Sequence, residues 1–406
     1  MSKKTKKQKW IKPRHTIITN IARYVLYPYT KIKYGIEIEK FQEQGNRPYL
    51  ILYNHQTGFD QFFVGMALRG PVYYVATEDI FSLGFLSSLL RFAVAPISIK
   101  KQTTDVTAVK NCVRIAKEGG TIAIAPEGNR TYHGRTVHIN PSIVSLIKIL
   151  NLPVAFFRIE GGYGVQPRWS DVIRKGKMRA YVSCVLEPKD IKTMTDDELI
   201  ALVEEKLYVD EANSDNLFHH QKSAEYLERV FYVCPYCGLS EFETQNDTIT
   251  CKKCKRQIKY LPTTELKGVG FEFPYRFAAD WYDYQCDFVN RQNPQEHLET
   301  AIYQNKITIS EVILNKKKVI LQENSQISLY GDRIIVYDVN GSNLVFYFSE
   351  TAALSVLGKN KINIYHNKKV YQITGDERFN ALKYVNFFYR YKNVSKGEGH
   401  GKFLGL

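Results

Sequence analysis

Short apolar runs and amphipathic stretches alternate between residues 49 and 186. Apolar runs of about four to eight residues are typical of buried strands, whereas apolar residues that recur every three or four positions predict helices. Their alternation predicts an α/β domain, in which helices cover a sheet. The predicted strands are 49–53, 72–76, 97–99, 121–125, 154–159 and 178–186, and the predicted helices are 60–68, 81–92, 106–117, 142–150 and 196–212.

The C-terminal half has a different pattern. Residues 213–221 are polar and predict a linker, and an aromatic-rich segment follows residue 259. From Ile307 onward the pattern predicts about six or seven short strands, and then an amphipathic helix over 377–391. Strands closed by a helix predict a β-rich domain that loosely resembles a membrane-binding pleckstrin-homology barrel. The predicted turns lie at 315–317, Gly331-Asp332, Asn340-Gly341 and His366-Asn367.

The positive charge is concentrated at the N-terminus. The chain of 406 residues has a formal net charge of +15, and ten Lys or Arg residues precede the first acidic residue, Glu37. Such an arm can meet nucleic-acid phosphates or an anionic membrane. An apolar stripe at helical spacing follows it, which is typical of a helix in a membrane interface and also of a helix that packs on its own domain. The stripe is Ile17, Ile18, Ile21, Tyr24 and Val25.

No stretch reaches the roughly 20 apolar residues that span a bilayer, and no secretory signal pattern follows the Lys run. The closest stretch, 80–99, is interrupted by Arg91, Pro96 and serines. We therefore expect a peripheral or monotopic protein at the cytoplasmic face of the cell membrane, with a phospholipid surface as a partner.

Four of the seven cysteines form two Cys-x-x-Cys pairs, Cys234 with Cys237 and Cys251 with Cys254, thirteen residues apart. In a reducing compartment this spacing predicts a structural zinc site of four thiolates, a zinc ribbon, and disulfides are the alternative. Four protein ligands leave no open position on the metal, so the Zn²⁺ is expected to stabilise the fold rather than to act in catalysis. The remaining cysteines are expected to be small, mostly buried thiols.

Candidate chemistry follows two of the predicted strands. His55 and Asp60 lie in Asn54-His55-Gln56-Thr57-Gly58-Phe59-Asp60, after the first strand. An imidazole five residues ahead of a carboxylate can serve as a general base that the carboxylate orients. Pro126-Glu127-Gly128-Asn129-Arg130 follows another strand, and there backbone amides and a guanidinium can hold a phosphate. Open α/β sheets place their sites past the carboxyl ends of strands.

These segments resemble the sequence blocks of the lysophospholipid and glycerolipid acyltransferase family, members of which make phosphatidic acid from lysophosphatidic acid. The family's first block, a histidine, four residues and an aspartate, matches His55 and Asp60. Its third block, usually Phe-Pro-Glu-Gly-Thr-Arg, matches residues 125–130 with two substitutions. The arginine of its second block falls on Lys101, which keeps the charge and loses the bidentate fork. The resemblance covers residues 17–212, and the fourth block matches Leu152-Pro153-Val154.

The resemblance implies transfer of a fatty acyl group from a thioester, acyl-CoA or acyl carrier protein, to the hydroxyl of lysophosphatidic acid. His55 would accept the hydroxyl proton and Asp60 would orient His55. Lys101 and Arg130 would hold the phosphate, Gly128 would allow close approach, and Glu127 would orient Arg130 or hydrogen-bond the acceptor. The alternatives are acylation of glycerol 3-phosphate or another lysolipid, a lipid-binding protein without catalysis, and a nucleic-acid-binding zinc ribbon. We do not expect nucleic acid as a partner, because a nucleic-acid-binding function would leave His55, Asp60 and Glu127 without a role.

The expected organisation has five parts. They are a basic arm with an interface helix (1–35), the acyltransferase domain (36–212), a linker with the zinc ribbon (213–260), an aromatic connecting segment (261–305) and the β-rich domain (306–406).

Overall fold

The structure is a computed structural model that describes residues 9–77, 85–99, 105–211, 215–313, 318–338 and 341–404. The chain divides into two compact units. Unit 1 comprises Met1–Asn129, Thr136–Gly161 and Lys177–Val209, and unit 2 comprises Arg130–Arg135, Gly162–Gly176 and Asp210–Leu406. Two short segments of the N-terminal half therefore belong to unit 2.

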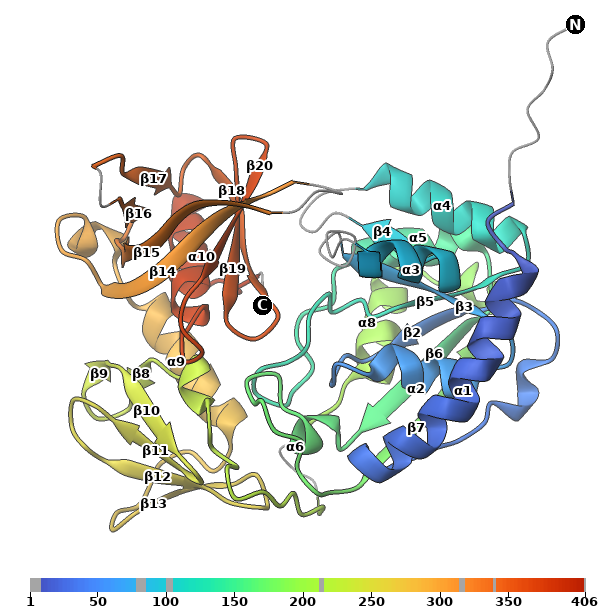
Figure 1. The fold of residues 1–406 in the computed structure, drawn as a ribbon, viewed down its shortest axis with the longest axis horizontal. Helices are drawn as coiled ribbons and strands as arrows, with labels where there is room; N and C mark the ends of the chain where they lie inside the picture. The colour runs from blue at the N-terminus through green and yellow to red at the C-terminus, as the bar shows by residue number, and fades with distance from the viewer. Residues whose placement is uncertain are drawn as a thin grey trace, which may run out of the picture. The chain divides into compact units, whose positions relative to one another are not determined.

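Unit 1 is built on a seven-stranded sheet in the order β1-β7-β6-β2-β5-β3-β4 (Figure 1). All neighbouring strands are parallel except β6 and β7, so the sheet is mixed. The strands are β1 (Ile36–Ile38), β2 (Leu50–Tyr53), β3 (Val72–Thr77), β4 (Ile97–Ile99), β5 (Thr121–Ile124), β6 (Val154–Glu160) and β7 (Met178–Leu186). The α/β prediction is confirmed, and the three-residue strand β1 is the one that the hydrophobic pattern missed.

The helices of unit 1 are α1 (Pro13–Tyr34), α2 (Asp60–Ala67), α3 (Phe85–Ala93), α4 (Val106–Lys117), α5 (Ser142–Leu150), α7 (Pro188–Ile191) and α8 (Asp196–Leu207). Buried residues of α4, α5 and α8 form one core with β2, β5 and β6. The prediction of a helix to residue 212 was wrong, because α8 ends at Leu207. Tyr208 is extended, and the Val209 N–H donates to Thr136 Oγ1 at 2.8 Å, which draws the chain out of the helix.

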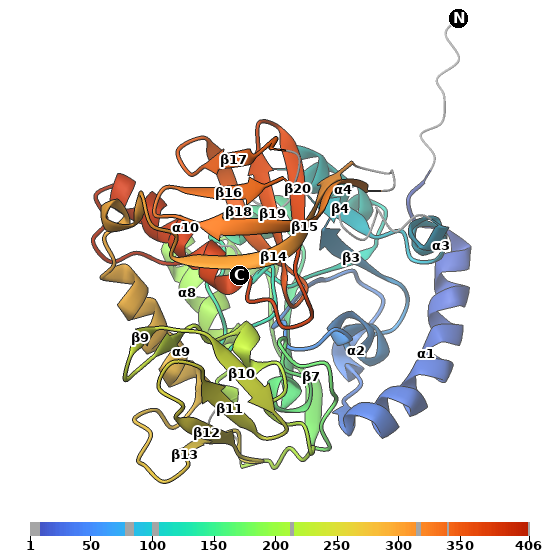
Figure 2. The same ribbon diagram turned by 60° about the vertical axis from the view of Figure 1, so that its left-hand side comes forward.

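The first part of unit 2 holds the cysteine motifs, in a two-stranded and a four-stranded antiparallel sheet (Figure 2). The strands are β8 (Val233–Cys234), β9 (Gly238–Leu239), β10 (Phe242–Gln245), β11 (Thr248–Cys251), β12 (Gln257–Tyr260) and β13 (Leu266–Gly268). The aromatic segment continues into α9 (Ala278–Asn290). Trp281 of α9 is fully buried and stacks on Phe231 at 3.7 Å between ring centroids. The aromatic residues thus form core of unit 2.

The second part of unit 2 is an antiparallel sheet of seven strands in the order β17-β16-β15-β14-β20-β19-β18, followed by helix α10 (Leu382–Ser395). The prediction of a β-rich domain with a terminal helix is confirmed. That helix begins five residues later than predicted, where Asn380 Oδ1 accepts from the Lys383 N–H. The strands are β14 (Tyr303–Val312), β15 (Val319–Leu329), β16 (Arg333–Tyr337), β17 (Leu344–Tyr347), β18 (Thr351–Leu357), β19 (Lys361–His366) and β20 (Lys369–Thr374).

Candidate functional site

Asn54 fixes the end of strand β2 next to the candidate base. Its Nδ2 donates to the Ile159 carbonyl and its Oδ1 accepts from the Ile159 N–H, both at 2.8 Å. The side chain therefore continues the ladder between β2 and β6 by one step after the β2 backbone turns away. Because Asn54 is fully buried, these bonds also satisfy its amide. His55 therefore follows a residue whose position at the carboxyl edge of the sheet is fixed.

Asp60 organises the loop between β2 and α2. Its carboxylate is fully buried and accepts the Gln56 N–H at 2.6 Å, the Thr57 N–H at 2.9 Å and the Thr57 hydroxyl at 2.7 Å. Its Oδ2 also lies 2.7 Å from His55 Nδ1. These donors stabilise a buried carboxylate, as does the N-terminus of α2 where Asp60 stands. The aspartate thus holds both the loop and the imidazole.

The bond to Asp60 decides which nitrogen of His55 is available. A carboxylate has no hydrogen to donate, so the hydrogen must be on Nδ1 of the ring. Nε2 then carries a lone pair and can accept a proton. The His55 side chain is 25% exposed while that of Asp60 is not exposed, so the base can be reached and its partner cannot. Chemically, the pair can accept a proton and stabilise the resulting imidazolium.

Glu127 supports His55 from the second motif. Its Oε1 accepts the His55 backbone N–H at 2.8 Å, and its Oε2 accepts the Val137 N–H at 3.4 Å. Burial raises the pKa of Glu127 to about 8, against these two hydrogen bonds, so the carboxyl is largely protonated at neutral pH. A protonated carboxyl keeps one O–H that can donate to a bound molecule. Sequence reasoning did not foresee this bond to His55, and no local spacing signals it.

The other predicted site residues have different places. Gly128 has a φ of +71°, a conformation that favours glycine, and no described atom lies within 4 Å of where a Cβ would stand. Arg130 belongs to unit 2, and its carbonyl accepts from Arg168 Nη1 at 2.9 Å. Lys101 lies outside the described residues. The structure therefore brings together His55, Asp60 and Glu127 in unit 1.

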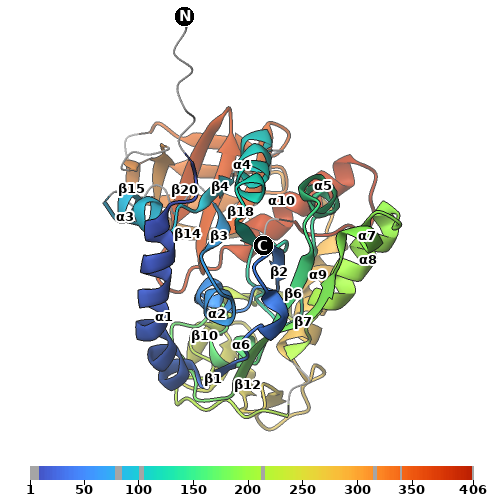
Figure 3. The same cartoon turned by 90° about the vertical axis from the view of Figure 1, so that its right-hand side faces the viewer.

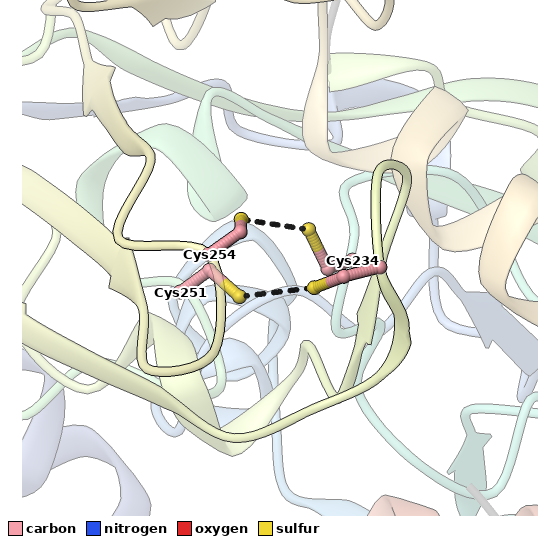
Figure 4. Close-up of side chains that lie close together, drawn as sticks. Cys234, Cys251 and Cys254 are labelled. Carbon is pink, nitrogen blue, oxygen red and sulfur yellow. Dashed lines mark hydrogen bonds between the residues drawn. The ribbon is translucent and has the colours of Figure 1, made fainter.

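The four cysteines of the two Cys-x-x-Cys motifs converge (Figure 4). Their sulfur atoms lie within 4.8 Å of one another, with 3.7 Å between Cys234 and Cys254 and 3.6 Å between Cys237 and Cys251. Zn–S bonds of about 2.3 Å in a tetrahedron place sulfurs about 3.8 Å apart. These separations fit a tetrahedral metal and exceed the roughly 2.05 Å of a disulfide.

Helix α1 lies beside α2 and α3 (Figure 3). Arg23 Nε donates to the Gly65 carbonyl of α2 at 2.7 Å, and the Arg14 guanidinium lies over Phe92 of α3 at 4.2 Å. Most of the predicted apolar stripe is exposed, with Ile21 at 60% and Tyr24 at 85%. These contacts and the buried ring of Tyr34, which packs against Phe63, attach the helix, whereas most of its predicted apolar stripe is exposed. Among the described helices, none is both long and apolar enough to cross a membrane.

Part of the chain is similar to known proteins. Residues 34–158 match the family model of the acyltransferases. The chain is similar to the 1-acyl-sn-glycerol-3-phosphate acyltransferase of Bacillus subtilis (strain 168), at 21% identity over 39% of this chain and 77% of the relative. It is similar to chloroplastic LPAT1 of Arabidopsis thaliana, also at 21% identity, over 41% of this chain and 47% of that protein. The crystal structure of PlsC from Thermotoga maritima, described as a 1-acyl-sn-glycerophosphate acyltransferase, aligns with a TM-score of 0.41 and 18% identity over 48% of this chain and 78% of that one.

The chain therefore carries an acyltransferase domain and is an acyltransferase enzyme. Its sequence resembles those of the 1-acyl-sn-glycerol-3-phosphate acyltransferases. The alignments with the bacterial and plant relatives each cover about two fifths of this chain. The cysteine motifs and the β-rich domain are additional parts.

Proposed function

We propose that the enzyme transfers a fatty acyl group from a thioester to the free hydroxyl of lysophosphatidic acid, which forms phosphatidic acid. The observation that carries the proposal is the His55–Asp60 pair, with Nδ1 bound to a buried carboxylate and Nε2 left to accept a proton. The Acyltransferase match covers this segment, and the relatives named above act on a 1-acyl-sn-glycerol 3-phosphate by their names.

The proposed reaction is a direct transfer. His55 Nε2 accepts the proton of the acceptor hydroxyl as its oxygen attacks the thioester carbonyl carbon. The tetrahedral intermediate then collapses, the C–S bond breaks, and the thiolate takes the proton from His55. Asp60 stabilises the imidazolium between these steps, a role worth several powers of ten in rate in comparable triads. The donor is acyl-CoA or acyl carrier protein, which present the same kind of thioester.

The acceptor's phosphate is assigned to Arg130 and Lys101, and the protonated Glu127 can hydrogen-bond the acceptor beside His55. Arg130 follows Glu127 by three residues, in the segment that matches the family's third block. Gly128 is exposed in a left-handed turn, where the backbone can be approached closely. Glycerol 3-phosphate is the second candidate acceptor, because it presents the same phosphate and hydroxyl groups.

The cysteine cluster is assigned a structural Zn²⁺ held by Cys234, Cys237, Cys251 and Cys254. The separations of the sulfurs support four thiolate ligands, which leave no position for substrate. The metal would fix the β8–β9 hairpin to the end of β11. This small zinc ribbon would gain stability that its core cannot supply alone.

Helix α1 is assigned to the membrane interface, at the cytoplasmic face of the cell membrane. Its exposed apolar residues and the preceding basic arm match what an anionic bilayer surface binds. The seven-stranded sheet with its C-terminal helix is compatible with the pleckstrin-homology-like architecture expected from the sequence. The five-part organisation expected from the sequence remains part of this proposal.

The test is transfer of a labelled acyl group from acyl-CoA, and separately from acyl carrier protein, by the purified full chain. Lysophosphatidic acid and glycerol 3-phosphate are compared as acceptors. Labelled phosphatidic acid is the expected product. Transfer to glycerol 3-phosphate alone would identify it as the acceptor in place of lysophosphatidic acid. If folded, vesicle-bound protein transferred the acyl group to neither acceptor, the proposal would be contradicted.

A further inference from the structure

Arg168 joins the two segments of the N-terminal half that belong to unit 2. It lies in Gly162–Gly176, and its Nη1 donates to the carbonyl of Arg130, in Arg130–Arg135, at 2.9 Å. The Arg168 side chain is only 1% exposed. A buried guanidinium needs protein acceptors in place of water, so this contact is costly to lose.

The same guanidinium binds the C-terminal sheet. Arg168 Nη2 donates to the Val356 carbonyl at 3.1 Å, and Nε donates to the Gly358 carbonyl at 2.7 Å. Val356 lies near the end of β18, and Gly358 lies in the turn before β19. One side chain thus connects the backbone of Arg130 to the β18–β19 turn through three hydrogen bonds. Burial lowers the pKa of Arg168 only to about 10, so it remains charged at neutral pH.

Tyr132 provides a second link to the same turn. Its ring is fully buried and lies 4.2 Å from the Arg168 guanidinium carbon. Its hydroxyl donates to the Lys359 carbonyl at 2.6 Å. A stacked cation and a buried hydroxyl bond each restrict the segment that begins at Arg130.

The far end of the segment is bound by helix α9. Arg135 Nη2 donates to Asp280 at 2.6 Å and Nη1 donates to Asp283 at 2.7 Å. His133 stacks on Tyr282 at 4.7 Å between ring centroids. Arg130–Arg135 is therefore attached both to the C-terminal sheet and to α9, and these elements decide where its backbone runs.

We propose that the C-terminal region is a working part of the acyltransferase, which positions Arg130 for the acceptor's phosphate, with Arg168 as the positioning residue. The inference rests on the proposed phosphate-binding role of Arg130. A guanidinium recognises phosphate through directed hydrogen bonds, so a displaced backbone weakens binding even when the charge is kept. The added domain then acts on acceptor affinity, beyond any role in attaching the enzyme to a surface.

The test compares Arg168→Gln with Arg229→Gln in the full chain. Arg229 is also buried in unit 2, and it binds Asp171 at 3.0 Å, the Trp169 carbonyl at 2.7 Å and the Glu377 carbonyl at 2.7 Å, none of which belongs to Arg130–Arg135. Arg168→Gln is expected to raise KM for lysophosphatidic acid roughly tenfold, with KM for the acyl donor unchanged. Arg229→Gln is expected to lower the unfolding temperature without changing KM for the acceptor.

Two further variants keep the outcomes distinct. Tyr132→Phe keeps the ring and loses the bond to Lys359, so it should raise KM for the acceptor by a smaller factor even if Arg168→Gln does not fold. In an Arg130→Ala background, Arg168→Gln should add no further increase, because both act through one contact.

An increase of KM in Arg130→Ala but not in folded Tyr132→Phe and Arg168→Gln would overturn the positioning role. An equal increase in Arg229→Gln would overturn it too, because the effect would then be general destabilisation. An unchanged KM in Arg130→Ala would instead locate the failure in the proposed phosphate contact, and the inference would fall with it.

Discussion

Within the described residues, two histidine–aspartate pairs have similar separations and very different surroundings. His55 Nδ1 lies 2.7 Å from Asp60 Oδ2 in unit 1, and His400 Nε2 lies 2.9 Å from Asp287 Oδ1 in unit 2. Asp60 is fully buried and accepts from two backbone N–H groups and a hydroxyl, whereas His400 and Asp287 are 69% and 53% exposed. A short contact therefore does not define a catalytic pair. The proposed catalytic role of His55 is supported by the burial of Asp60 and by the further donors that fix its carboxylate.

The largest expected effect separates the two pairs by function. His55→Ala should lower the rate of acyl transfer by a factor of about 10³ or more, because the proton acceptor is lost. His400→Ala should leave the rate unchanged. The measurement is turnover of labelled acyl thioester, with circular dichroism to verify that both variants fold. Equal rates for His55→Ala and the unchanged enzyme would end the assignment of the base.

The second prediction concerns the carboxylates. Asp60→Asn should lower turnover by about 10² or more, because an amide stabilises the imidazolium less and can present N–H groups to the Gln56 and Thr57 N–H donors. It should also lower the free energy of unfolding by about 1–3 kcal/mol. Asp287→Asn, in the exposed pair, should change neither. Turnover and urea unfolding of both variants test whether burial makes the difference.

The third prediction addresses the cysteine cluster of unit 2. One Zn²⁺ per chain is expected by elemental analysis, and its loss in Cys251→Ser should lower the free energy of unfolding by several kcal/mol, since metal binding is coupled to folding. Cys112→Ser, at a buried thiol of unit 1 outside the cluster, should keep the metal. Full zinc content in Cys251→Ser would contradict the four-thiolate site.

The fourth prediction uses the buried acid beside His55. The pKa of Glu127 in the folded chain is about 8, above its usual value of 4.5, so the folded state favours the protonated form. Stability that depends on this group is present at low pH and is lost as the pH rises from about 4.5 to 8. Glu127→Gln cannot ionise, so its unfolding free energy relative to the unchanged protein should rise by a few kcal/mol between pH 5 and pH 8.5.

Glu118→Gln is the matched comparison for that window. Burial raises the pKa of Glu118. Hydrogen bonds from the backbone N–H groups of Ile11 and Trp10 and from the Arg114 side chain lower this pKa by more than burial raises it, so the net shift is downward. Its stabilising contribution is present above the usual pKa and is lost as the pH falls. Urea unfolding at both pH values should therefore show no gain for Glu118→Gln at pH 8.5. Parallel pH profiles for Glu127→Gln and the unchanged protein would contradict the raised pKa.

The smallest expected effect concerns the surface of α1. Ile21→Asp should weaken binding to anionic vesicles by roughly tenfold, because it places a charge in the apolar stripe. Turnover of a water-soluble short-chain acceptor should stay the same. Asn20→Asp, at an exposed polar position of the same helix, is the control for added charge alone. Vesicle sedimentation measures both, and equal binding by the two variants would remove α1 from the interface.

The sequence by itself determined the α/β and β-rich halves, the His55–Asp60 pair and the convergence of the four cysteines. In each case the information is local. Apolar residues at every second position predict strands, and those at every third or fourth position predict helices. Four residues separate His55 from Asp60 and thirteen separate the two Cys-x-x-Cys motifs, so both groupings join neighbouring parts of the chain. The sequence also predicted the order of most elements along the chain, because the spacing of apolar residues changes where a strand ends and a helix begins.

Only the tertiary structure decided the contacts that join distant residues. Glu127 accepts the His55 N–H across 72 positions, Asn54 completes the β2–β6 ladder across 105, and Arg168 binds Val356 across 188. No periodicity encodes such pairs, because any buried polar group can be satisfied by many partners and the packing selects one. The same holds for α1, whose apolar stripe predicted an interface helix and a packed helix equally. Arg14, Arg23 and Tyr34 attach the helix to unit 1, and the stripe stays largely exposed.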